Sequence, residues 1–314
     1  MLHLRLITPS GTTDDVVRLI ERTAGTAHLV VLPGAARNPV GDLVLCDVAR
    51  EAGDPLIGGL RALGLDRTGS IAVDDVGLSL SRRADKAEQE APGEGADAVL
   101  WEGLTEATHE ESTLSVTYVA FITLATMIAA CGVVLDNAIL IVGAMAVGPE
   151  FGPLAGISTA VVRRHPRLAL RSLTALLVGF AAAMLVTVGF SLFMDAIGQF
   201  HKSDLEGARP NTAFVYAPDA FSFVVAVLAG IAGTLSLTSA KSGALVGVAI
   251  SVTTVPAAAN AAVALAYGDT SQTVGSTNQL LLNLLGIVLA GIGTLGAQKY
   301  FWRRQRTAPQ GREP

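Results

Sequence analysis

The sequence predicts a polytopic α-helical membrane protein that carries a small N-terminal α+β domain. Of its 314 residues, 51% are hydrophobic and only 16% are charged, whereas soluble domains contain roughly a quarter charged residues. The shortage of charge lies in the C-terminal two-thirds of the chain, where whole segments such as residues 114–135 and 270–298 carry none. The 33 glycines and the aromatic content of only 5% suit closely packed membrane helices.

The same composition excludes several classes of protein. The net charge of −5 argues against a general nucleic-acid binder. Cys46 and Cys131 form no CxxC pair, so neither a disulfide framework nor a thiolate zinc site is expected. The histidines are scattered along the chain without an HExxH motif. A secreted disulfide protein and an ordinary cytosolic enzyme are therefore both disfavoured.

Residues 1–81 are predicted to form a ferredoxin-like domain with the element order βαββαβ. Residues 2–7 alternate apolar and polar side chains, as a half-buried strand does. Residues 12–15 (TTDD) supply capping side chains before an apolar helical stripe. Further strands are predicted at residues 28–34 and 41–48 and from residue 70, and a second helix at residues 52–64.

Residues 82–113 are predicted to connect this domain to the membrane. Residues 82–111 hold nine acids and three bases. We expect the first half of this segment to be a solvated linker. From Ala96 onward, the spacing of apolar side chains predicts a short amphipathic helix that leads into the first membrane span.

Residues 114–301 are predicted to cross the membrane six times. A helix of about 20 apolar residues spans the roughly 30 Å hydrocarbon layer. The alternative, a very large soluble helical core, would need polar faces at a helical period, and these segments show none. The spans are expected at about residues 116–135, 138–161, 173–194, 220–239, 243–266 and 280–298.

The positive charges in the connections predict the orientation. Ten Lys and Arg residues lie in the connections of one side, whereas the other side holds only Lys202 and Arg209. By the positive-inside rule, both termini, including the basic tail 302–314, are expected in the cytoplasm. The predicted location is therefore the plasma (inner) membrane of a bacterium, with the loops 195–219 and 268–278 facing outward.

The six spans divide into two sets of three, and each middle span is interrupted. The sequence GPEFGP interrupts the second span at residues 148–153, and TTVP interrupts the fifth at residues 253–256. Because each set crosses the membrane an odd number of times, the second would be inverted relative to the first. Paired Gly/Pro interruptions in inverted three-helix repeats are a sequence sign of a transporter-like site near the midplane.

Several motifs in this part resemble one known family. The stretch LDNAILIVGAM at residues 135–145, the following Pro149 and GP at 152–153, and RRHPR at 163–167 resemble the hallmark of domain-of-unknown-function family 389 (DUF389). PAAAN at residues 256–260 resembles the family's second motif. The resemblance extends over about residues 1–300 but implies little about activity, since the family is functionally unassigned. Glu150 departs from the family pattern, in which the positions between the two prolines are usually small and apolar.

Glu150 is the main candidate for an ion-binding residue. It lies 13 residues from Asn137 and 12 from Val162, which is roughly 18–20 Å of helix from either end of the span. A charge at this depth costs on the order of 3 kcal/mol. The competing interpretation is a shorter span with Glu150 in a wet loop. The candidate substrate- or ion-binding residues are Pro149, Glu150, Pro153, Thr253, Thr254, Pro256 and Asn260; each polar residue of the fifth span could instead make an ordinary packing hydrogen bond.

No enzyme is predicted. GIGTLG at residues 291–296 satisfies GxGxxG, but it lies inside a span rather than between a strand and a helix. The membrane part shows no nucleophile–base pair, metal cluster or pair of acids. No metal site is expected, and the only cofactor suggested is a nucleotide or metabolite bound by the N-terminal domain, an expectation based on fold analogy.

Two functions remain open from the sequence. The first is a transporter or channel-like protein of unknown substrate, regulated by a cytoplasmic ligand-binding domain, in which Glu150 binds a cation or a proton. The second is a membrane-anchored sensor of a small molecule, or a dimeric scaffold without transport. In either case the expected partners are the lipid bilayer, a small molecule or ion, and a second copy of the chain. The second copy is expected because Gly- and Ala-rich helix faces favour self-association.

Overall fold

The computed structural model describes residues 1–91, 98–216, 219–239 and 253–307. The chain divides into two compact units. The N-terminal unit is built from residues 1–102 with short segments at 238–240 and 300–314, and the membrane unit from residues 103–237 and 241–299. Each unit is described by itself.

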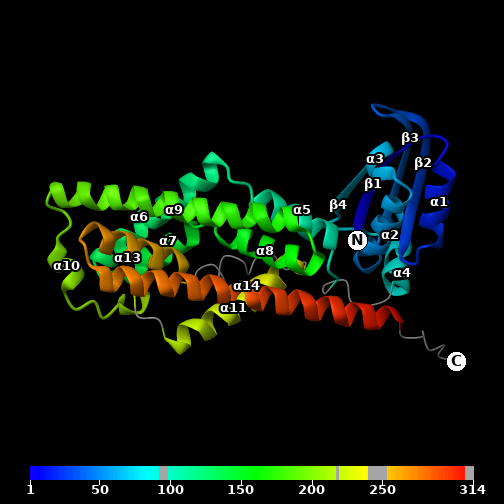
Figure 1. Ribbon diagram of the computed structural model, residues 1–314. Coiled ribbons are helices and arrows are strands. Elements are labelled where there is room, and N and C mark those ends of the chain that lie inside the picture. Colours follow the sequence, from blue (N-terminus) through cyan, green and yellow to red (C-terminus); the bar gives the residue numbers. More distant parts are fainter. Residues whose placement is uncertain (92–97, 217–218, 240–252, 308–314) are drawn as a thin grey trace. The chain divides into compact units, whose positions relative to one another are not determined.

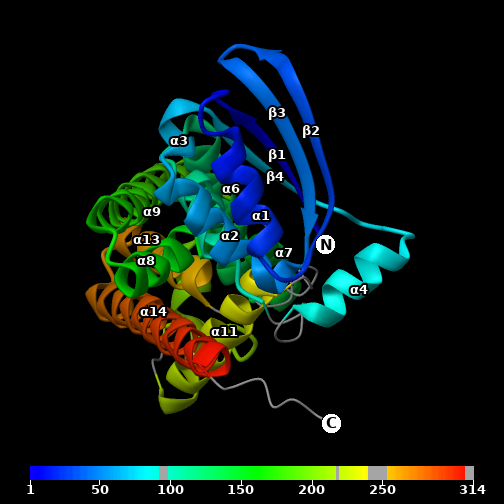
Figure 2. The same ribbon diagram turned by 90° about the vertical axis from the view of Figure 1, so that its right-hand side faces the viewer.

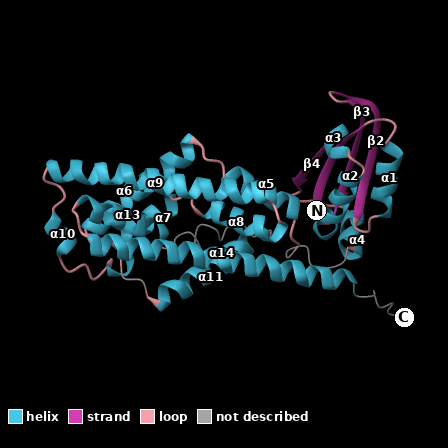
Figure 3. Cartoon of the chain, viewed as in Figure 1, coloured by secondary structure: helices cyan, strands magenta, loops and turns pink. Residues whose placement is uncertain are grey.

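The N-terminal unit contains a four-stranded antiparallel sheet (Figure 3). The strands are β1 (Leu2–Thr8), β2 (Thr26–Arg37), β3 (Val40–Val48) and β4 (Ser70–Asp75), in the order β2-β3-β1-β4. The helices are α1 (Thr13–Arg22), α2 (Arg50–Ala62) and the short α3 (Leu65–Thr68). The predicted order βαββαβ is therefore present, with α3 added before the last strand, and the pairing is that of a split βαβ unit.

The alternation of side chains explains this sheet. Leu2, Leu4 and Leu6 point to one face of β1 and are all buried, while His3 and Arg5 point to the other. Figure 2 shows α1 and α2 lying on the same face of the sheet. The core that they enclose consists of Leu2, Leu4, Leu6, Val16, Ile20, Val44, Cys46, Val48, Ala52, Leu56, Leu60 and Leu65.

Residues 82–90, which we expected to be solvated linker, form helix α4 (Arg82–Glu90). The Ser81 hydroxyl accepts a hydrogen bond from the Arg83 N–H and so caps the helix. Ala84 and Ala87 are buried, and α4 packs against β2 and β3. Most side chains of this segment are charged, and its buried face consists of small alanines. The sequence pattern therefore does not indicate an amphipathic helix. A helix follows as α5 (Trp101–Glu111), but it begins after Val99 and Leu100, which were predicted to lie within it; Ala96 is outside the described residues.

In the described part of the membrane unit, four helices are long and apolar enough to cross a membrane. They are α6 (Val116–Val134), α9 (Pro166–Ala196), α11 (Ala220–Thr238) and α14 (Thr270–Thr307) (Figure 1). Helices α7 (Ala138–Val147) and α8 (Phe151–Arg163) meet at an angle of 52° and together could form a fifth span. The predicted interruption of the second span is therefore present as a bend. The short segments α10 (Lys202–Glu206) and η2 (Ala213–Val215) lie between α9 and α11.

The predicted span at 243–266 is seen only in its second half. Residues 243–252 lie outside the described residues, and α13 (Thr254–Ala266) is an apolar helix of 13 residues. The structure thus contains four or five candidate spans, and the predicted six spans and the inverted repeat remain predictions. Helix α13 packs against α6 and α9. Each of its residues from Thr254 to Ala264 is buried, as expected for a helix enclosed on all sides.

Candidate functional site

The bend between α7 and α8 holds Glu150 in a buried position. Gly148 ends α7, α8 begins at Phe151, and Pro149 and Glu150 form the break. The Glu150 side chain is 4% exposed. Its Oε1 atom accepts a hydrogen bond of 2.6 Å from the Thr254 hydroxyl at the start of α13. Its Oε2 atom has no hydrogen-bond partner among the described residues. The carboxylate is therefore only half satisfied.

Gly148 leaves the space that this carboxylate occupies. A Cβ atom at position 148 would lie 2.3 Å from Glu150 Oε2 and 2.9 Å from Val255 Cγ2. Both distances are shorter than real Cβ contacts allow. The absence of a side chain at Gly148 thus lets the carboxylate fold back over the end of α7.

Thr253, the neighbour of Thr254, faces a cavity instead of Glu150. The Thr253 hydroxyl accepts a hydrogen bond of 2.9 Å from the Asn283 side chain on α14. Thr253 and Asn283 line a cavity of about 360 Å³ whose other walls are mostly apolar. Glu150 is not among its lining residues, which are Ala138, Ile141, Val142, Met145, Phe214, Asp219, Phe221, Ser222, Val225, Ala226, Thr253 and Asn283.

The two remaining prolines shape helix starts. Pro153 is the third residue of α8, and Pro256 is the third residue of α13. In a first turn the backbone N–H has no partner within the helix, so proline costs no hydrogen bond there. Neither proline has a polar side chain to offer a ligand. Their positions are therefore compatible with the starts of α8 at Phe151 and α13 at Thr254.

Asn260, the last predicted site residue, belongs to a separate polar cluster. It lies six residues after Thr254 on α13, or about 9 Å along the helix axis. Its Oδ1 atom accepts a hydrogen bond of 2.9 Å from Arg209 Nη1, and its Nδ2 atom donates one of 2.7 Å to Ser276. The structure therefore joins Glu150 with Thr254 but not with Asn260. From the sequence, Arg209 was only a loop charge, and its contact with Asn260 was missed.

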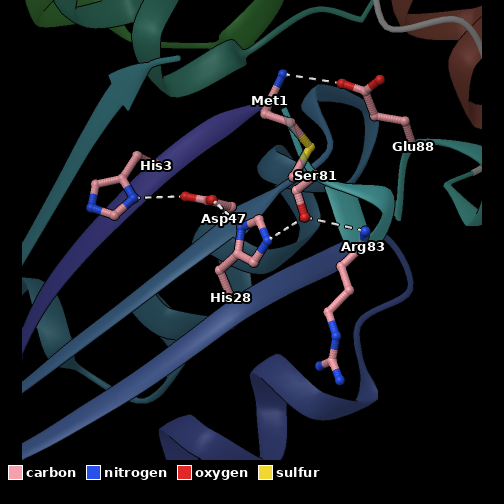
Figure 4. Close-up of polar contacts among 7 residues, drawn as sticks. All are labelled: Met1, His3, His28, Asp47, Ser81, Arg83 and Glu88. Carbon is pink, nitrogen blue, oxygen red and sulfur yellow. Dashed lines mark hydrogen bonds and ion pairs between the residues drawn. The ribbon is translucent and has the colours of Figure 1, made fainter. Parts of the chain in front are cut away.

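A second group of polar side chains, also missed from the sequence, lies on the N-terminal sheet (Figure 4). The register pairs His3 on β1 with Asp47 on β3, and His3 Nδ1 lies 2.7 Å from Asp47 Oδ1. His28 Nδ1 lies 2.6 Å from Asp47 Oδ2, and His28 Nε2 lies 2.9 Å from the Ser81 hydroxyl. His28 has a φ of 51° at an irregularity of β2, a conformation that hydrophobic periodicity does not predict.

The hydrogen bond between His28 and Ser81 connects the sheet to α4, because Ser81 is also the N-cap of that helix. Burial raises the pKa of Asp47, but the hydrogen bonds with His28 and His3 outweigh it and hold the pKa below its ordinary value. Within the described residues, no group of three or more His, Cys, Asp or Glu side chains is arranged to hold a metal ion.

Comparison with known proteins relates part of the membrane unit to a described family. Residues 145–289 match the family model described as "Domain of unknown function (DUF389)". This confirms the resemblance over that range, which contains the second motif and begins at the last residue of the first, at Met145. The chain is also 25% identical over 224 residues to the uncharacterized protein MJ0678 of Methanocaldococcus jannaschii, a match that covers 70% of this chain and 67% of that protein. No solved structure matches the chain.

Proposed function

We propose, from a membrane unit that carries a DUF389 domain over residues 145–289, that the protein is a transporter or channel-like protein for a small ion or solute. In this proposal Glu150 binds a proton or a cation at the break between α7 and α8. The N-terminal unit binds a small ligand, such as a nucleotide or metabolite, and regulates the membrane unit. The protein acts as a homodimer in the plasma membrane.

One observation carries this proposal: at a bend in an apolar helix pair lies a buried carboxylate, one oxygen of which has no partner in the part of the chain that the structure describes. A buried charge is costly unless its lone pairs are satisfied. A purely structural glutamate would be expected to have both oxygens engaged. In membranes, ionisable side chains at irregular backbone mark ion and proton paths. Oε2 of Glu150, which has no partner among the described residues, is the position at which a proton or a cation would bind.

The surroundings support a moving solute. Thr254 holds Oε1 in place, while the adjacent Thr253 faces the cavity beside α7 and α14. Through Thr254, the carboxylate is therefore only one residue away from a side chain that lines the cavity. The cavity is large enough for several water molecules, since each takes up about 30 Å³.

Proton flux into vesicles tests the role of Glu150. Purified protein is reconstituted into vesicles that contain a pH-sensitive dye, and a potassium diffusion potential drives proton entry. Wild-type protein should acidify the vesicles faster than empty vesicles. Glu150→Gln should reduce that rate about tenfold or more, the factor that corresponds to roughly 1.4 kcal/mol, while Glu110→Gln, which alters an exposed glutamate of the same unit, should not. The same assay is repeated with sodium- and potassium-loaded vesicles to detect a cation instead.

An unchanged rate for Glu150→Gln would remove Glu150 from the transport step. Should Glu150→Gln not fold, Thr254→Val removes the hydroxyl that orients the carboxylate and leaves the charge intact. It should slow the flux less than Glu150→Gln would. No flux above that of empty vesicles with any of the three ions would contradict an ion path and favour a sensor or scaffold.

Water access gives an independent test. In a protein whose Cys46 and Cys131 are replaced by alanine, a cysteine at Thr253 should react with a membrane-impermeant thiol reagent, because Thr253 lines the cavity. A cysteine at Ala258, buried within α13, is the unreactive control. A scaffold with a dry interior would leave both cysteines unreactive.

The proposed orientation has a direct measurement. Both termini are placed in the cytoplasm because ten of twelve cationic side chains in the connections lie on their side. A reporter fused after Arg306 should therefore report the cytoplasm, and one inserted within residues 200–210 the outside. A reporter after Arg306 that reports the outside would contradict the proposed orientation of the C-terminus.

A further inference from the structure

Arg209 is a buried cation held by neutral side chains. It lies between α10 and η2 and is 4% exposed. Its Nη1 atom donates to Asn260 Oδ1 at 2.9 Å, and its Nη2 atom donates to Gln272 Oε1 at 2.5 Å. Its guanidinium carbon lies 4.8 Å from the centre of the Tyr216 ring. Asn260 and Gln272 bring α13 and α14 to the same guanidinium, but neither carries a charge.

The charge of Arg209 is not balanced by a contacting acid. In the part of the chain that the structure describes, no carboxylate forms an ion pair with it. Asp136 and Asp269 act on it electrostatically, but neither makes a hydrogen bond or ion pair with it among the described residues. Asp136 accepts hydrogen bonds from Asn211 and Thr212, and Asp269 accepts one from the Gln272 N–H. A buried guanidinium with neutral acceptors loses hydration without gaining an equivalent anion.

One edge of the guanidinium is also free. Arginine has five N–H donors, and Nε has no hydrogen-bond partner among the described residues. Nη2 carries two hydrogens, of which Gln272 takes one. The Nε–H lies on the edge that it shares with one Nη2–H, and these two donors are the pair that binds a carboxylate or phosphate in bidentate fashion. The free edge is therefore matched to an oxyanion.

We infer that Arg209, Asn260 and Gln272 form a binding site for an oxyanion, a carboxylate or phosphate group, that occupies the free Nε–Nη2 edge of Arg209. Asn260 and Gln272 offer Arg209 only neutral oxygens, whereas an oxyanion on the free edge would add the attraction between opposite charges and a bidentate geometry. The inference deepens the proposed function by adding a class of solute, but it concerns binding and does not depend on flux.

Thermal melting of the purified full-length protein tests the site. The probes are acetate, inorganic phosphate and phosphatidic acid in mixed micelles, each compared with equal ionic strength of sodium chloride. A ligand of the folded state raises the melting temperature in a saturable manner. A response to phosphate or acetate indicates a free solute, whereas a response to phosphatidic acid alone indicates a lipid headgroup. Absence of a saturable response to all three probes would overturn the inference.

Three variants connect the response to Arg209. Arg209→Gln should abolish it, and Lys202→Gln, which removes an exposed cation of the same connection, should retain it. Arg209→Lys keeps the positive charge but loses the planar guanidinium that binds an oxyanion with two N–H groups. It should therefore weaken the apparent affinity for the responding anion about tenfold. It also covers the case in which Arg209→Gln does not fold. A response of equal size in Arg209→Lys and the wild type would contradict bidentate binding at this edge.

Asn260→Asp provides a matched internal competitor. It places a carboxylate 2.9 Å from Nη1, so it should raise the melting temperature without any probe and reduce the response to added anions. Glu150→Gln should bind the anion as the wild type does. If Glu150→Gln loses flux but still binds the anion, the anion site at Arg209 stands independently of transport. If flux is intact but no anion binds, the anion site is refuted and the proposed transport function is not.

Discussion

Asp42 in the N-terminal unit and Glu150 in the membrane unit are both buried carboxylates, at 7% and 4% exposure. The oxygens of Asp42 accept hydrogen bonds from the Gly34 N–H, the Ser10 hydroxyl and the Thr13 hydroxyl, at 2.8, 3.2 and 2.7 Å. Glu150 accepts one side-chain bond, from Thr254, and has one free oxygen among the described residues. The difference separates a carboxylate that stabilises a fold from one that has capacity left for a ligand.

The largest effect is expected at Gly148. Gly148→Ala would place a methyl group 2.3 Å from Glu150 Oε2, and overpacking of this kind costs about 1–3 kcal/mol. The melting temperature should fall, and much of the loss should be recovered in the double variant with Glu150→Ala. Gly143→Ala is the control, since a Cβ atom there meets nothing within 4 Å and alanine favours a helix by roughly 0.5–1 kcal/mol. Equal behaviour of the two glycine variants would contradict the placement of the carboxylate over Gly148.

A smaller effect distinguishes the two carboxylates directly. Asp42→Asn replaces one acceptor oxygen by an amide that must face a hydrogen-bond donor, so it should lower the thermal stability of the N-terminal unit. Glu150→Gln keeps an oxygen for Thr254 and meets no donor at the other position, so it should leave the melting temperature unchanged or raise it. If Glu150→Gln lowers the melting temperature more than Asp42→Asn does, Glu150 has the structural role that is assigned here to Asp42.

The smallest effect is the dependence of stability on acid. The Thr13 and Gly34 hydrogen bonds hold the pKa of Asp42 below its ordinary value of 3.8, and the pKa of Asp47 is also lowered. A lowered folded-state pKa contributes stability above the unfolded value, and this is lost as the pH falls through the folded value. An isolated fragment of residues 1–91 should melt cooperatively at neutral pH and lose stability below about pH 4.

The double variant Asp42→Asn, Asp47→Asn provides the control for the acid titration. It should be less stable at neutral pH and change less between neutral and acidic pH. An acid response identical to that of the wild-type fragment would assign the loss to other groups. A fragment that showed no cooperative melt would instead show that the N-terminal unit needs the rest of the chain.

The element order of the N-terminal unit was predictable because strands and helices repeat their apolar positions at different periods. The apolar helices and the break at Glu150 were predictable from the position of charges and prolines. Contacts between distant residues were not. Arg209 and Asn260 are 51 residues apart, and His28 reaches Ser81 through a positive φ at a bulge, which no periodicity encodes. Helix α4 is not predictable from apolar periodicity, because Ala84 and Ala87 are the only buried residues on its face.

Helix α13 is lined by alanines at 257, 258, 259, 261, 262 and 264, all of them buried. Alanine has no side-chain rotamers to rearrange, and its small surface forms only low ridges against neighbouring helices. A displacement of α13 along its axis therefore has little interlocking to overcome. Because the same helix carries Thr254 at its start and Asn260 further along, such a slide would break the Thr254–Glu150 and Arg209–Asn260 hydrogen bonds together.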